Sequence, residues 1–278
     1  MDPAPPARRY GQNFLANPSL AAWLVDRFAP REDDVVVEIG PGRGALTLEL
    51  APRCGRLVAL EIDERLIGPL RDALAAWPYA EVRRADALDV DWDALGRELG
   101  ARLRVIGNLP YNVGTAIVGR LLATDAVRDA QFVLQREVVD RLVAGPGSRR
   151  YGPLSVLVAL RTRARRLRTI APGSFRPRPR VDSAVIALSF EPDAPLPAAE
   201  VPWLRSWLHR GFARRRRTLA GNLADRREQV RGFLAERGLP PDLRAEALPP
   251  ADWLDLARRL EAVTPPDPDR AGTENGAT

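Results

Sequence analysis

The chain lacks lysine altogether and contains a single cysteine, Cys54, and a single histidine, His209. One cysteine cannot form an internal disulfide, so an intracellular location is the default expectation. A structural zinc site needs about four cysteine or histidine ligands, and one residue of each type cannot form it, so we expect no metal. The simplest interpretations are a packed thiol at Cys54 and a surface or interface side chain at His209.

Long apolar runs are also absent, since no stretch approaches the roughly 20 residues that a membrane span needs. Residues Met1–Arg9 contain proline and arginine without an apolar core. This is not the pattern of a secretory signal, and we expect a flexible arm over residues 1–9. We therefore expect a cytoplasmic protein that has no membrane partner. As a separate expectation, we take it to be a monomer.

All 42 basic residues of the chain are arginines. With 36 acidic residues, they give a formal net charge of +6. GC-rich coding alone would explain the choice of arginine. Guanidinium nevertheless stays charged and pairs bidentately with phosphate. The basic surface therefore favours a polyanionic partner such as nucleic acid.

Short apolar runs alternate with amphipathic stretches in the first part of the chain. The expected strands are Val35–Ile39, Leu57–Ile62, Glu81–Arg84, Leu103–Ile106 and Gln131–Leu134. Helices are expected before, between and after them, at Ser19–Phe28, Ala45–Leu50, Arg65–Trp77, Thr115–Leu122 and Arg136–Ala144. This alternation predicts an α/β fold with a parallel, doubly wound sheet. Two later runs, Ala164–Ile170 and Ala184–Phe190, predict an antiparallel edge on it.

The pattern changes after the proline-rich linker Glu191–Pro197 and becomes purely helical. We expect a main domain over residues 10–191 and a small helical domain over residues 198–264. The polar residues 265–278 predict a disordered tail.

A glycine-rich turn, Gly40–Gly44, follows the first strand with the spacing G-x-G-x-G. Dinucleotide-binding folds use G-x-G-x-x-G instead, and Pro41 removes an N–H that a pyrophosphate would need. Glu38 would repel an anionic ligand. The turn therefore favours a cationic ligand that carries an amino acid, such as S-adenosylmethionine.

Two further carboxylates stand at expected strand ends, where ligands of such sheets bind. Glu61 could accept hydrogen bonds from ribose hydroxyls, and Asp86 could accept one from the adenine amine. Either residue alone could equally be a solvated loop carboxylate. Together with Gly40 and Asn108, which also fall at strand ends, they predict one cofactor site.

The tetrapeptide Asn108-Leu109-Pro110-Tyr111 ends the fourth strand. Pro110 fixes its own φ and biases Leu109 toward an extended conformation. The Asn108 carboxamide and the Leu109 carbonyl could then accept the two N–H bonds of an exocyclic amine, while the Tyr111 ring stacks on the base. A strand-ending turn with a buried tyrosine is the alternative. We expect an orienting site without a general base.

With these pieces in view, the chain resembles the ribosomal RNA adenine dimethyltransferases, and most closely the KsgA type that acts on the small subunit. The resemblance runs from Tyr10 to about Leu260. It rests on "YGQNFL" at Tyr10–Leu15, "EIGPGRGALT" at Glu38–Thr47, "LEID" at Leu60–Asp63, "ADAL" at Ala85–Leu88, "NLPYNVGT" at Asn108–Thr115, "QREVVDRLVAGPGSRRYGPLSV" at Gln135–Val156, "FRPRPRVDSAV" at Phe175–Val185, "FARRRRTLAGNL" at Phe212–Leu223 and "RAEAL" at Arg244–Leu248.

The resemblance implies a Rossmann-like methyltransferase sheet of seven strands, mostly parallel, with a small all-helical C-terminal domain. It implies S-adenosylmethionine as cofactor, and it implies that two adjacent adenosines near the 3′ end of small-subunit rRNA each receive two methyl groups. By motif match, the cofactor would contact Asn13, Leu15, Gly40, Glu61, Asp86 and Asn108. The catalytic residues would be Asn108, Leu109, Pro110 and Tyr111.

RNA binding is expected from exposed arginines and one aromatic ring. The candidates are Phe175, Arg176, Arg178, Arg180, Arg214, Arg215, Arg216 and Arg217. A solvated helix face is the alternative for Arg214–Arg217, and simple packing is the alternative for Phe175. Two other functions stay open: resistance-type methylation of large-subunit rRNA, and an assembly factor that relies little on catalysis.

Overall fold

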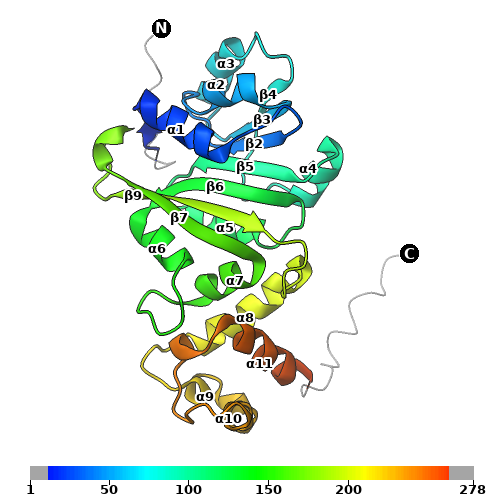
Figure 1. Cartoon of the computed structure of the whole chain (residues 1–278), viewed down its shortest axis with the longest axis vertical. Coiled ribbons are helices and arrows are strands. Elements are labelled where there is room, and N and C mark those ends of the chain that lie inside the picture. Colours follow the sequence, from blue (N-terminus) through cyan, green and yellow to red (C-terminus); the bar gives the residue numbers. More distant parts are fainter. Residues whose placement is uncertain (1–11, 263–278) are drawn as a thin grey trace.

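The computed structural model describes residues 12–262, and its centre is a seven-stranded sheet (Figure 1). The strand order is β4-β3-β2-β5-β6-β9-β7. The strands are β2 (Val35–Ile39), β3 (Arg56–Glu61), β4 (Ala80–Arg84), β5 (Leu103–Asn108), β6 (Val127–Gln135), β7 (Thr162–Ile170) and β9 (Ser183–Phe190). The parallel α/β sheet expected from the alternating pattern is therefore confirmed.

The expected antiparallel edge is confirmed, since the two late strands form that end of the sheet and pair antiparallel with each other. β9 is antiparallel to β6 on one side and to β7 on the other, so β7 again runs in the direction of β6. The reversed strand is thus internal, and the edge strand is not reversed relative to the parallel set. Sequence periodicity reports which residues are apolar, and it does not report which strand inserts between two others.

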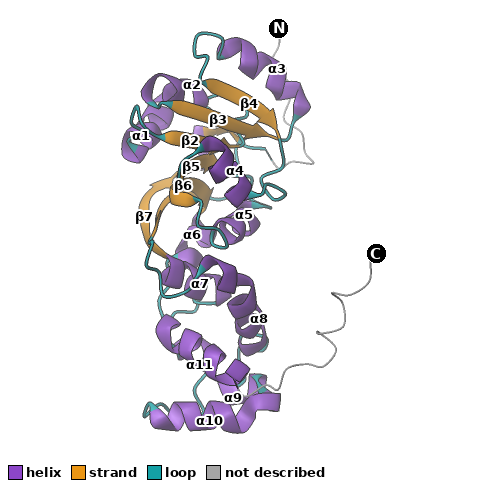
Figure 2. Cartoon of the chain, turned by 90° about the vertical axis from the view of Figure 1, so that its right-hand side faces the viewer, coloured by secondary structure: helices purple, strands orange, loops and turns teal. Residues whose placement is uncertain are grey.

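Helices cover both faces of the sheet (Figure 2). Leu57 and Ala59 pack with one set of helices, while Val58 and Leu60 pack with the other, because successive side chains of a strand point to opposite faces. The first set is α1 (Pro18–Phe28), α2 (Thr47–Leu50) and α3 (Glu64–Ala73). The second is α4 (Trp92–Leu99), α5 (Gly114–Leu121), α6 (Arg136–Leu142) and α7 (Pro153–Arg161).

Helix α1 begins as its sequence predicts. The Asn17 side chain accepts a hydrogen bond from the Leu20 N–H at 3.1 Å, and Pro18 occupies the first helical position. Other boundaries differ from expectation. The helix predicted to reach Trp77 already ends at Ala73, and the one predicted from Ala45 begins at Thr47.

The C-terminal part is helical and lies at one end of the molecule (Figure 1). Its helices are α8 (Val201–Gly211), α9 (Leu219–Asn222), α10 (Arg227–Glu236) and α11 (Pro250–Ala262). Their buried faces belong to the same hydrophobic cluster as α5, α6 and α7. Short 3₁₀ turns occur at Ala51–Arg53, Pro172–Ser174, Ala198–Glu200, Ala224–Arg226 and Ala245–Ala247. The expected arm over 1–9 and tail over 265–278 lie outside the described residues.

A second, two-stranded sheet joins β1 (Phe14–Leu15) to β8 (Phe175–Arg176) in antiparallel register. The Ala16 N–H extends this pairing with a 2.9 Å hydrogen bond to the Ser174 carbonyl. No expectation from the sequence included this sheet. It fixes the N-terminal segment against the proline-rich loop that follows β7.

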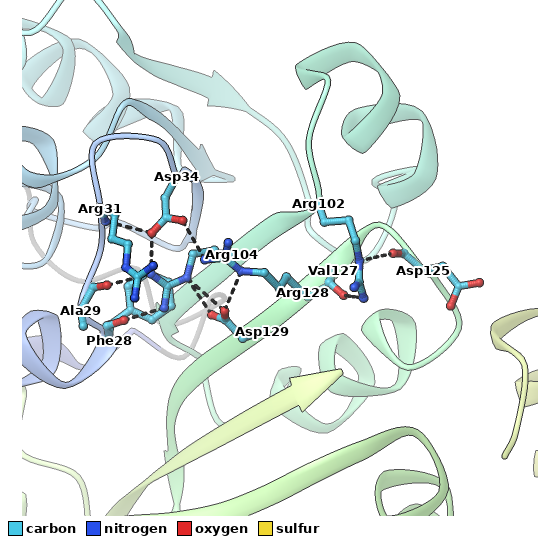
Figure 3. A network of polar contacts seen from close by, with 10 residues as sticks. All are labelled: Phe28, Ala29, Arg31, Asp34, Arg102, Arg104, Asp125, Val127, Arg128 and Asp129. Carbon is cyan, nitrogen blue, oxygen red and sulfur yellow. Dashed lines mark hydrogen bonds and ion pairs between the residues drawn. The ribbon is translucent and has the colours of Figure 1, made fainter. Parts of the chain in front are cut away.

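Arg104 on β5 anchors α1 to the sheet (Figure 3). It is 9% exposed and forms ion pairs with Asp34 at 2.6 Å and Asp129 at 3.0 Å. It also donates to the carbonyls of Phe28 and Ala29, where α1 ends. These bonds satisfy helix-end acceptors, and at the same time they pair the buried Asp34 and the partly buried Asp129 with a cation.

We predict that Arg104→Met lowers the free energy of unfolding by about 3 kcal/mol, because it removes one of the two guanidinium groups that pair with the buried Asp34, the other being Arg128, together with both bonds to the end of α1. Arg102→Met is the matched control, since Arg102 is exposed and donates to the carbonyls of Asp125 and Val127. It should cost less than about 1 kcal/mol. Urea unfolding measures both, and equal losses would contradict the anchoring role.

Candidate functional site

A cleft opens at the carboxyl ends of the parallel strands and encloses about 730 Å³, its open mouth included. Four parts of the chain line it: the segment around β1, the end of β2 with the loop after it, the end of β3, and the turn after β5. The lining residues are Gln12, Asn13, Phe14, Leu15, Glu38, Gly40, Pro41, Gly42, Arg43, Ala45, Leu46, Glu61, Ile62, Asn108, Leu109, Pro110 and Tyr111. The site is thus assembled from segments far apart in sequence.

The glycine loop owes its shape to two positions. Gly42 has φ +58, and a Cβ there would lie 2.9 Å from the Phe14 ring, so only glycine fits. Gly40 has φ +66 and no atom within 4 Å of the place of a Cβ. The backbone at Gly40 therefore faces open space in the cleft, where a ligand can approach it closely.

Glu61 at the end of β3 is 2% exposed and holds this loop. One carboxylate oxygen accepts the Gly42 N–H at 3.0 Å, and the other accepts the Asp63 N–H at 2.8 Å. Burial raises the pKa of Glu61, while these backbone hydrogen bonds lower it in part. Each oxygen keeps a second lone pair, so Glu61 can still accept a bond from a ligand hydroxyl.

Glu38 at the end of β2 also lines the cleft, although the predicted site residues do not include it. It is 1% exposed, and its Oε2 has no hydrogen bond partner. Burial, with the nearby Glu61 charge adding to it, raises the pKa of Glu38 to about 8, and the Thr47 hydroxyl opposes this shift. An unpartnered buried acceptor in a cleft fits a ligand that brings a cationic donor.

Asn108 is the last residue of β5, and its Nδ2 donates to the Asn13 carbonyl at 2.8 Å. Because the donor end of the amide is engaged, its Oδ1 is left as the acceptor end. The Leu109 N–H donates to the Val133 carbonyl at 3.2 Å, which fixes the next peptide. The Pro110 carbonyl accepts the N–H of Gly114, where α5 begins.

The predicted cofactor residues come together with one exception. Asn13, Leu15, Gly40, Glu61 and Asn108 all line the cleft, whereas Asp86 does not. Asp86 follows β4, and its carboxylate accepts the Leu88 N–H at 2.9 Å. In this structure Asp86 shapes a turn beside the cleft.

The predicted RNA-binding residues divide into buried and exposed. Phe175 is fully buried in the core on the α1 side of the sheet, so its interpretation as a base-stacking ring is wrong for this structure. Pairing of β8 with β1 turns this ring inward. The guanidinium-bearing residues of the same loop are all exposed: Arg176, Arg178 and Arg180.

Arg214–Arg217 are exposed as well, but they lie in the turn between α8 and α9 and not on a helix face. Thr218 directly after them caps α9 by accepting the Gly221 N–H at 3.0 Å. Within residues 12–262, no group of histidine, cysteine and acidic side chains could hold a metal ion. Nor is any helix in that range long and apolar enough to cross a membrane.

The fold and cleft are those of a methyltransferase, and comparison with known proteins identifies the group. The family model described as "Ribosomal RNA adenine dimethylase" matches residues 6–262. The chain belongs to this family of rRNA adenine dimethyltransferases.

Individual proteins similar to this chain also carry names of rRNA methyltransferases. The "Ribosomal RNA small subunit methyltransferase A" of Bordetella avium is 42% identical, over 92% of this chain and 95% of its own. The protein of that name from Acidithiobacillus ferrooxidans is 43% identical, over 90% and 92%. Among solved structures, the 23S rRNA methyltransferase ErmE has a TM-score of 0.70 at 27% identity, covering 90% of this chain and all of its own. A Plasmodium falciparum dimethyladenosine transferase shares the fold, with a TM-score of 0.74 at 21% identity, over 90% and 98%.

We predict that Glu38 makes the ligand-free protein less stable as the pH rises. The unfolded carboxyl group has a pKa near 4.5, and the folded one has a pKa of about 8. Between these values the folded state binds more protons, so stability falls with increasing pH by up to about 1.4 kcal/mol per pH unit. Glu38→Gln should remove this slope, which thermal unfolding between pH 5 and 8.5 would measure. The same slope in both proteins would contradict the assignment.

Proposed function

We propose that the chain transfers methyl groups from S-adenosylmethionine to the exocyclic amines of two adjacent adenosines near the 3′ end of small-subunit rRNA, and dimethylates each. The observation that carries the proposal is the Asn108–Tyr111 turn, which shares one cleft with the glycine loop. The names of the relatives in Bordetella and Acidithiobacillus support the small subunit as substrate. A ribosomal substrate accords with a cytoplasmic location, and we propose that the enzyme acts there as a monomer.

The residues of the cleft fit this cofactor. The unpartnered Glu38 oxygen suits its ammonium group, and the spare lone pairs of Glu61 suit its ribose hydroxyls. Pro41 and the acidic strand ends disfavour a pyrophosphate. When bound, S-adenosylmethionine supplies a methyl group on a sulfonium, which is a good leaving group. For Asp86 we retain the adenine amine as partner: its Oδ1 accepts the Leu88 N–H, and its Oδ2 is the acceptor for the amine.

The amine of the target adenine is a weak nucleophile because its lone pair is delocalised into the ring. Asn108 Oδ1 and the Leu109 carbonyl would accept its two N–H bonds and favour a pyramidal nitrogen. Tyr111 would stack on the base, worth about 1–3 kcal/mol. Orientation of this kind can supply roughly 7–11 kcal/mol, so the site needs no strong base.

Two competing functions are less well supported. ErmE, named for the large-subunit 23S rRNA, is 27% identical, whereas the relatives named for the small subunit are 42–43% identical. A factor without catalysis would have no need of the glycine loop, Glu61 and Asn108 in one cleft.

The test is methylation of isolated ribosomal subunits by the purified protein with a labelled donor. We expect label in adenine of undermethylated small subunits and none in large subunits. Label confined to large subunits would overturn the substrate, and no label in either would overturn the activity.

Asn108→Ala should lower the rate of this reaction by about 100-fold or more, because it removes an acceptor that orients the amine. Binding to small subunits should stay within about twofold. Asn112→Ala is the matched control, since Asn112 is exposed in the same turn and outside the cleft lining. A methylation rate near that of the unmodified protein in Asn108→Ala would refute the orienting role.

We further propose that Arg214–Arg217 and the exposed Arg176, Arg178 and Arg180 bind rRNA phosphates. Reversal of Arg215 and Arg216 to glutamate should weaken subunit binding and reduce the slope of log K against log salt by about 2. Reversal of Arg84 and Arg97, exposed on β4 and α4, is the control. An unchanged slope in the first pair, measured by filter binding, argues against phosphate contacts there.

A further inference from the structure

The Tyr111 hydroxyl forms a 2.6 Å hydrogen bond with the Ser183 Oγ, across 72 residues of sequence. Ser183 is the first residue of β9 and is fully buried. It belongs to the "VDSAV" segment, Val181–Val185, and none of the residues proposed to contact the cofactor or the RNA lies in this segment. The bond therefore links this segment to the proposed substrate turn.

Ser183 is held rigidly from several sides. On β9 it pairs with Gln135 of β6 and Ile170 of β7, at the carboxyl ends of those two strands. The preceding residue, Asp182, accepts the Arg136 N–H at 2.9 Å and forms an ion pair with its guanidinium at 2.8 Å. Ser183 can thus act as a fixed point for a neighbouring side chain.

Tyr111 lies in a turn and is only half-buried, so its ring needs such a fixed point. The backbone of the turn is held by hydrogen bonds of Leu109 and Pro110, but these leave the side-chain torsions of Tyr111 free. A hydrogen bond at the far end of the ring restricts both torsions at once. It thereby sets the plane that Tyr111 presents to the cleft.

We propose that Ser183 is a positioning residue that, through Tyr111, secures the second methyl transfer to each adenine. This inference rests on the proposed function. After the first transfer the amine keeps one N–H, so one of its two acceptors has lost its partner. The orientation of the methylated base then depends more on the ring against which it stacks.

In that second step the N6 lone pair forms the new N–C bond while the C–S bond of the donor breaks, its electron pair staying on sulfur. The remaining N–H proton leaves to water, and dimethyladenine results. The step needs no further reactant. A poorly held ring would slow it selectively and cause monomethyladenine to accumulate.

The experiment compares Ser183→Ala, Tyr111→Phe and the double variant on undermethylated small subunits. Mass spectrometry follows monomethyl- and dimethyladenosine over time, and calorimetry measures donor affinity. Each variant should slow the second transfer by about tenfold, the loss expected for one hydrogen bond, and the first by less than threefold. The double variant should be no slower than either single one, because both remove the same bond.

Ser155→Ala is the matched control: Ser155 is 1% exposed, and its hydroxyl donates to the Arg141 carbonyl, away from the cleft. It should leave the ratio of monomethyl to dimethyl product unchanged. Equal slowing of both transfers in Ser183→Ala, or additive effects in the double variant, would overturn the inference. If Ser183→Ala fails to fold, Tyr111→Phe alone decides: an unchanged ratio rejects the role. Absence of methylation by the unmodified protein would instead reject the proposed function.

Discussion

The hydrogen bond from Asn108 Nδ2 to the Asn13 carbonyl is the contact on which the arrangement of the cleft depends. An amide has a donor end and an acceptor end, so engaging the nitrogen dedicates the oxygen to acceptance. The same bond fastens the N-terminal segment across the end of β5. Because β1 in this segment pairs with β8, the proline-rich loop is tied to the same wall of the cleft.

The two buried glutamates of the cleft show how the same side chain acquires different properties from its surroundings. Glu61 accepts hydrogen bonds from two backbone N–H groups, and the one from Gly42 fixes the shape of the glycine loop. Glu38 faces the same cleft with one oxygen unpartnered, and the charge of Glu61 disfavours its ionisation further. A cationic ligand would relieve both the missing bond and the repulsion, so the empty acceptor itself selects for positive charge.

Much of the fold follows from local sequence, because β-branched runs, the Asn17 cap and the glycine turn act over a few residues. The strand ends at Gly40, Glu61 and Asn108 then meet in one cleft because carboxyl ends of parallel strands share an edge. What escaped prediction depends on pairing between distant segments. Insertion of β9 between β6 and β7, and the inward turn of Phe175 by β1, have no local signature. Asp86 follows a strand end as expected, but its absence from the cleft lining is visible only in three dimensions.

The segment after α6 connects the sheet to the C-terminal helices and so holds the turn of Arg214–Arg217 in place. The Gly147 N–H donates to the Glu246 carbonyl at 2.7 Å, and the Tyr151 hydroxyl donates to the Leu248 carbonyl at 3.0 Å. The Tyr151 ring meets Phe212 edge-on, and Phe212 in turn stacks on Trp253. Arg214 follows Phe212 by two residues. The turn that carries Arg214–Arg217 is therefore fixed relative to the sheet by packing and hydrogen bonds together, and an RNA held there would meet the cleft at a defined distance.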